Sequence, residues 1–144
     1  MSSSRTSSAS AVSSAPTPSP AGCGAPAPAE LLAAITEFND GRFFEQHETL
    51  ELLWRAEPGP LRDLYRGILQ IGVGCHHWRA GNRHGARTLL RKGIDYLVPF
   101  APACRGVDVA ALVRDARALL QRLDQGEAPF DLSDAPRVRL TAIY

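Results

Sequence analysis

Apolar side chains recur every three or four residues from about residue 29 to residue 126, which is the spacing of amphipathic helices. Gly, Pro, Asn and Asp divide this stretch at intervals, and these residues commonly begin or end helices. Five helices are therefore predicted, over about residues 29–38, 42–55, 61–79, 83–98 and 109–125. No strand pair or internal repeat is evident. We predict an all-α fold, a compact bundle of about five helices spanning residues 29–126.

The segments on either side of this bundle lack a helical pattern. Residues 1–28 are mostly Ser, Ala, Pro, Thr and Gly, a composition that predicts disorder because little of it can be buried in a core. Residues 127–144 contain two prolines, so we expect an extended segment packed on the bundle. Its predicted apolar anchors are Phe130, Leu132, Val138, Leu140 and Ile143.

The predicted second and third helices carry polar residues where a plain core helix would not. His47 and Glu51 are four residues apart and share a helix face with Phe43 and Trp54. The third predicted helix is apolar nearly all round except for one polar stripe. The stripe consists of Asp63, Arg66, Gln70 and His77, with Gly67 and Gly74 between them. Glycines inside a helix reduce its stability, and we expect them here because a neighbouring helix packs very close.

Charge and cysteine content narrow the functional classes. The chain holds 16 Lys and Arg against 15 Asp and Glu, a net charge of +1, so no strong field favours nucleic acid or an anionic membrane. No apolar run is long enough to span a bilayer. Cys23, Cys75 and Cys104 are odd in number and widely spaced, which argues against a disulfide framework and favours a reducing cytoplasm. Residues 1–28 lack a secretory pattern, and plastid import is a minor alternative.

Three segments together resemble the domain of unknown function 309 family. They are Phe38–Arg55, Gly67–His77 and Gly81–Leu90, and the resemblance extends over about residues 31–123. It implies a small helical domain of bacterial or plastid type. Such proteins are often labelled predicted metal-dependent hydrolases, a label that itself derives from the family's His and Glu residues.

On this chain the resemblance implies a site between the second and third helices. His47, Glu51 and His77 would be ligands of one divalent ion, and zinc, iron and manganese all suit this donor set. Glu48 would be the general base for a bound water, while Gln70 and Asn82 would orient the ligands. A zincin motif is absent, because no second His follows His47-Glu48 at the required spacing.

Two other functions remain open at this point. The first is a non-enzymatic interaction domain, in which the buried His, Glu and Gln side chains form a structural hydrogen-bond network. Its partner would be a protein that binds an exposed face, for example the basic series Arg83, Arg87 and Arg91. The second is a metal-free pocket for a small molecule at the glycine-rich helix contact. The sequence does not identify a substrate, an ion or an oligomeric state.

Overall fold

The computed structural model describes residues 20–126 and 131–141 and confirms the all-α bundle. The helices are α2 (Ala29–Asn39), α3 (Phe43–Ala56), α4 (Leu61–Arg79), α5 (Arg83–Leu97) and α6 (Val109–Asp124). Short 3-10 turns follow at η1 (Val98–Phe100) and η2 (Leu132–Asp134). The five predicted helices are thus all present, with ends that differ from the prediction by a few residues.

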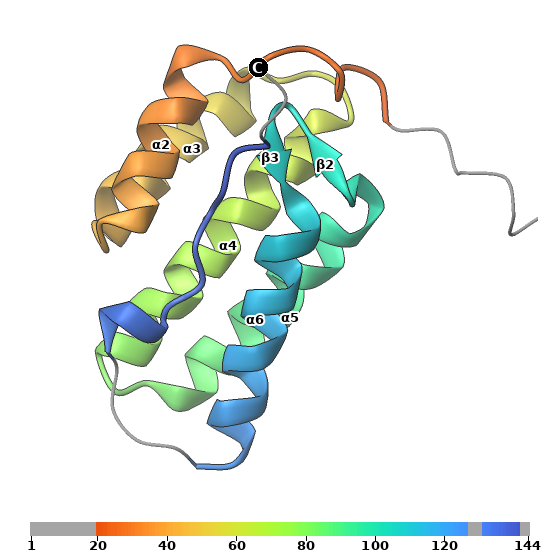
Figure 1. Cartoon of the computed structure of the whole chain (residues 1–144). Helices are drawn as coiled ribbons and strands as arrows, with labels where there is room; N and C mark the ends of the chain where they lie inside the picture. The colour runs from red at the N-terminus through yellow and green to blue at the C-terminus, as the bar shows by residue number, and fades with distance from the viewer. Residues whose placement is uncertain (1–19, 127–130, 142–144) are drawn as a thin grey trace, which may run out of the picture.

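Helix α4 is the centre of the bundle, with α3 packed on one side of it and α5 on the other (Figure 1). Leu64, Ile68 and Ile71 of α4 have no exposed surface, as expected for a central helix. Its polar stripe lies outside this core, because Asp63 is exposed and Arg66, Gln70 and His77 are half-buried. The stripe is therefore the outer edge of α4, where the helix meets solvent between its two neighbours.

Gly67 and Gly74 of α4 and Gly93 of α5 lie where these two helices pack against each other. A Cβ on Gly93 would lie 2.6 Å from Ile71 Cδ1 and 3.0 Å from the backbone oxygen of Gly67. A Cβ on Gly67 would lie 2.7 Å from Leu97 Cγ, and one on Gly74 would lie 3.1 Å from Leu90 Cγ. Carbon atoms do not approach so closely. The prediction that these glycines permit close helix packing is confirmed.

A small hairpin between α5 and α6 corrects the expectation that the chain has no strand pair. Strand β2 (Ala103–Cys104) pairs antiparallel with β3 (Val107–Asp108). The two-residue loop between them has positive φ at both positions, 53° at Arg105 and 77° at Gly106, as in a type I′ turn. Strands this short give no readable alternation, which is why the sequence pattern missed them.

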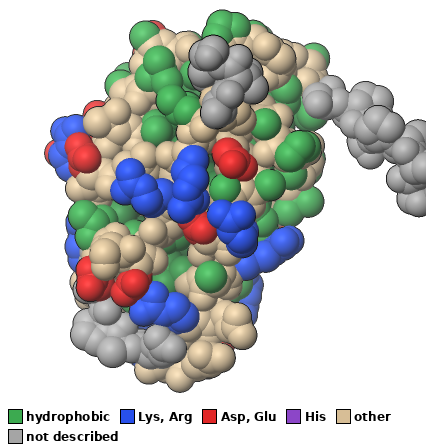
Figure 2. Space-filling model, viewed as in Figure 1, with side chains coloured by type: hydrophobic (Ala, Val, Ile, Leu, Met, Phe, Trp, Pro, Cys, Tyr) green, Lys and Arg blue, Asp and Glu red, His purple; other side chains and the backbone are tan. Residues whose placement is uncertain are grey.

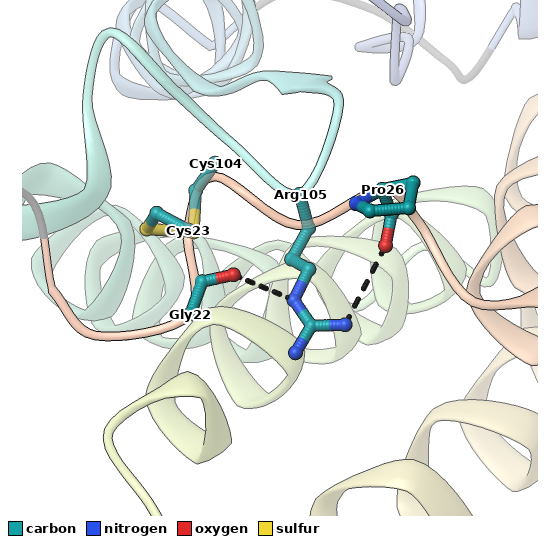
Figure 3. Close-up of a disulfide and its surroundings, with 5 residues drawn as sticks. All are labelled: Gly22, Cys23, Pro26, Cys104 and Arg105. Atoms are coloured by element: carbon teal, nitrogen blue, oxygen red, sulfur yellow. Dashed lines mark hydrogen bonds between the residues drawn. A yellow bond between two sulfur atoms is a disulfide. The ribbon is translucent and has the colours of Figure 1, made fainter.

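A disulfide between Cys23 and Cys104, 81 residues apart in the chain, attaches the segment before α2 to this hairpin (Figure 3). Arg105 reinforces the attachment, since its Nε donates to the Gly22 oxygen at 2.8 Å and its backbone N donates to the Cys23 oxygen at 2.7 Å. The argument against a disulfide was therefore wrong, and the case for a reducing cytoplasm that depended on it loses its basis.

The disulfide also changes the view of the predicted N-terminal tail. Cys23 is buried, and residues 21–24 form a turn against the bundle, so the expectation of disorder is wrong for residues 20–28. Composition could not reveal this, because the order comes from the covalent bond and from hydrogen bonds to the distant hairpin. The rest of that expectation, residues 1–19, lies outside the described residues.

Residues 131–141 of the C-terminal segment cross the bundle between α2 and α6 (Figure 1). Val138 is buried, and the Asn39 side chain exchanges two hydrogen bonds of 2.9 Å with its backbone N and O. Of the other predicted anchors, Leu132 and Leu140 remain 44% and 46% exposed, and Phe130 and Ile143 lie outside the described residues. The face that this segment crosses carries Lys and Arg side chains interspersed with Asp and Glu (Figure 2).

Candidate functional site

His47 lies half-buried on α3 and faces a small hollow rather than the core. The hollow has a volume of about 180 Å³ and is lined by Phe43, Phe44 and His47 of α3 and by Val73 and His76 of α4. The structure thus brings His47 toward His76, which is not among the predicted site residues. The missed signal is helix geometry, because His76 follows Val73 by three residues and the two share a face.

The other predicted site residues point in separate directions. Glu48 is exposed on α3, and the Glu51 carboxylate is 3.0 Å from the Arg55 guanidinium, one turn further along. His77 lies on α4 with its Nδ1 3.2 Å from Nδ2 of Asn82. Asn82 caps α5, accepting a 2.9 Å hydrogen bond from the backbone N of Gly85. His77 and Asn82 therefore meet, whereas His47 and Glu51 do not join them.

The predicted metal ligands do not converge in this arrangement. Within the described part of the chain, no three His, Cys, Asp or Glu side chains lie together in a way that could hold a metal ion. A protein metal site needs at least three such donors around one point. The side chains of His47, Glu51 and His77 as they stand do not fit a shared ion. The metal site stays a prediction from the family resemblance.

The buried polar residue of this region is Gln46, which the sequence reasoning overlooked. Its side chain has no exposed surface and packs against Gly72 of α4, where a Cβ would lie 2.6 Å from Gln46 Cδ. Nε2 donates to the backbone oxygens of Phe43 and Leu69, each at 3.4 Å, and Oε1 has no partner among the described residues. The predicted buried network of His47, Glu51 and Gln70 is replaced by this one amide.

Cys75 is fully buried in α4, and this burial raises the pKa of its thiol to about 12. A thiol with so high a pKa stays protonated near neutral pH, and the thiolate is the nucleophilic form. Despite its neighbours His76 and His77, Cys75 is therefore an apolar core residue.

The solvent-facing side of α3 carries two large exposed apolar side chains. Phe44 is 66% and Leu52 is 71% exposed, and both flank the exposed Glu48. At about 100° per residue, these three side chains fall within an arc of about 80°. We call this surface, completed by Glu45 and Glu51, the α3 face.

The near-zero net charge hides a strong separation of charge along the chain. Residues 29–57, which form α2 and α3, hold seven Asp and Glu against two Arg. Residues 58–126 hold eleven Lys and Arg against five Asp. The α3 face therefore lies in an acidic half of the domain, and the basic series on α5 lies in the other half. Arg87 and Arg91 of that series each lie 3.7 Å from the Asp124 carboxylate.

Comparisons with known proteins find similarity in the central part of the chain. Within residues 20–126 and 131–141, no helix combines the length and apolar character needed to cross a bilayer. An uncharacterized protein of Bacillus subtilis (strain 168), YpuF, is 37% identical over 65 residues, which make up 44% of this chain and 37% of YpuF. The model of a domain of unknown function, DUF309, matches residues 31–89, from α2 into α5. Residues 31–89 are therefore similar to the DUF309 family.

Proposed function

We propose that this domain is a non-enzymatic binding module whose α3 face docks a basic amphipathic helix of another protein. The observation that carries the proposal is the pair Phe44 and Leu52, which are 66% and 71% exposed on one helix face. Burying one such side chain contributes about 1.5–3 kcal/mol. Large apolar side chains grouped on a surface are typical of protein interaction sites.

The charges around these two side chains favour a basic partner. Glu45 and Glu48 are exposed on the same face, while Arg55 pairs with Glu51. A helix with apolar residues at three- and four-residue spacing and Lys or Arg beside them would match both properties. The neighbouring hollow of His47 and Val73 offers such a helix a place for one apolar side chain.

A labelled peptide tests this proposal directly. The probe is a helical peptide of Leu and Lys in amphipathic order, with a scrambled peptide and a Leu/Glu peptide as controls. We expect fluorescence anisotropy to show binding of the Leu/Lys peptide alone. Phe44→Ser should weaken it by at least about tenfold. Leu140→Ser, which alters a side chain 46% exposed on the C-terminal segment, should leave binding unchanged. Equal binding by both variants, or no binding by the native protein, refutes the proposal.

The metal-dependent hydrolase implied by the family resemblance is the competing function. It requires His47, Glu51 and His77 to turn toward one ion, with Glu48 near the bound water. The metal content of the purified, untagged protein and of His47→Ala separates the two functions. Near-stoichiometric zinc, iron or manganese that is lost in the variant favours the hydrolase. Protein that stays metal-free after incubation with these ions favours the binding module.

A further inference from the structure

A second hollow lies between α4 and α5 and differs in character from that of His47. Its volume is about 390 Å³, and its walls are Arg66 and Gln70 of α4 and Lys92, Asp95 and Tyr96 of α5. All five side chains have a polar group. Polar groups that converge in one hollow can orient a small ligand.

Arg66 is held in place by two aromatic rings from different helices. Its guanidinium carbon lies 4.9 Å from the ring centre of Trp54 on α3 and 5.2 Å from that of Tyr96 on α5. Stacking of this kind fixes the plane of the guanidinium but does not use its N–H donors. Within the described residues, these donors meet no hydrogen-bond acceptor and no carboxylate within 4.0 Å. A positioned and unused guanidinium is well suited to an oxyanion.

Charge and hydrogen bonding in the same hollow define the ligand further. Lys92 adds a second positive charge, and Asp95 supplies the one carboxylate, so the lining has a net charge of +1. The Oε1 atom of Gln70 is buried without a partner among the described residues. An unsatisfied acceptor of this kind reduces stability. If the Gln70 amide turns toward the hollow, a ligand hydroxyl satisfies this oxygen, and the Asp95 carboxylate could accept a second hydroxyl.

We propose that this hollow binds a small anion in which a phosphate or carboxylate is joined to at least one hydroxyl group. Arg66 and Lys92 contact the oxyanion, and Gln70 accepts the hydroxyl. Trp54 and Tyr96 are positioning residues that keep the Arg66 plane fixed. The site is separate from the α3 face, so the two proposals stand or fall independently.

Binding is measured by tryptophan fluorescence, because Trp54 stacks on Arg66, and independently by thermal shift. The probes are glycerol 3-phosphate and malate, with inorganic phosphate and glycerol as fragments that lack one of the two groups. We expect saturable binding of at least one of the first two, at about 1 mM or tighter. Inorganic phosphate and glycerol should both bind more weakly. Tighter binding of glycerol 3-phosphate would show a preference for phosphate, and tighter binding of malate a preference for carboxylate.

Two matched variants locate the site. Arg66→Met should weaken binding by at least about tenfold, and Arg66→Lys should weaken it less, because it keeps the charge but loses the planar donors. Arg62→Met is the control, since Arg62 also stacks on Trp54, at 5.1 Å, but does not line the hollow. Circular dichroism checks that each variant is folded. No saturable binding up to about 10 mM, or equal loss in Arg62→Met and Arg66→Met, overturns the proposal.

Discussion

Replacing Gly93 by Ala tests how tightly α4 and α5 are packed. The added Cβ would lie 2.6 Å from Ile71 Cδ1, 2.8 Å from Ile71 Cγ1 and 3.0 Å from the backbone oxygen of Gly67. The Ile71 side chain could shift in part, but the Gly67 oxygen belongs to the backbone of the central helix. The two helices must therefore move apart.

The expected change in stability is the difference of two effects. Ala is favoured over Gly inside a helix by about 1 kcal/mol, whereas overpacking a core costs about 1–3 kcal/mol. Because two atoms lie closer than 3.0 Å and a backbone atom lies at that distance, we expect the upper part of that range. The free energy of unfolding should fall by about 1–2 kcal/mol.

Urea unfolding followed by circular dichroism measures this change. With a slope of about 2 kcal/mol per molar urea, the midpoint should fall by about 0.5–1 M. Ala33→Gly on the exposed surface of α2 is the control that isolates the helix preference alone. In an Ile71→Val background, which lacks the Cδ1 atom, the cost of Gly93→Ala should be smaller. A stabilising effect of Gly93→Ala would refute the close packing described for these helices.

Three further predictions follow from burial, the disulfide and the cap of α5. Burial raises the pKa of Cys75 from 9.0 to about 12, so the folded state holds the thiol proton more tightly than the unfolded state. The resulting contribution to the free energy of unfolding is complete below pH 9 and is lost as the pH rises to 12. The free energy of unfolding should therefore fall by about 4 kcal/mol over this pH range. Urea unfolding curves of Cys75→Ala should show a smaller fall. Replacing Cys23 and Cys104 by Ser should lower the free energy of unfolding by up to about 4 kcal/mol, since the bond closes a long loop; an unchanged urea midpoint would contradict this. Asn82→Ala should cost about 1 kcal/mol through loss of the cap on Gly85, seen as a lower melting temperature, and no change would show that the cap contributes little.

Periodicity was sufficient to predict the bundle, because each helix buries one face or, in α4, most of its circumference. It also identified Gly67 and Gly74 as positions of close helix contact, which depend on local sequence. The Cys23–Cys104 disulfide and the Asn39–Val138 hydrogen bonds join residues 81 and 99 apart. No local pattern records such pairings, so the order of residues 20–28 and the path of the C-terminal segment were not predictable in detail.

The candidate site shows the same limit at a finer scale. Gln46, His47 and Glu51 lie at neighbouring positions around α3. Turning the helix about its axis by one residue, about 100°, changes which of them is buried. The structure buries Gln46 against Gly72 and leaves His47 and Glu51 half-exposed. Polar identity drew attention to His and Glu, whereas the missing side chain of Gly72 was the better guide to the buried group.

The proposal of an α3 docking face is tested most directly by nuclear magnetic resonance. The Leu/Lys peptide would be added to the isotope-labelled full chain, and the backbone amide shifts followed residue by residue. We expect the largest changes at Phe44, Glu48 and Leu52 and at the hollow of His47, with little change in α6. Changes concentrated on α5 or α6 instead, or none at all, would contradict the account.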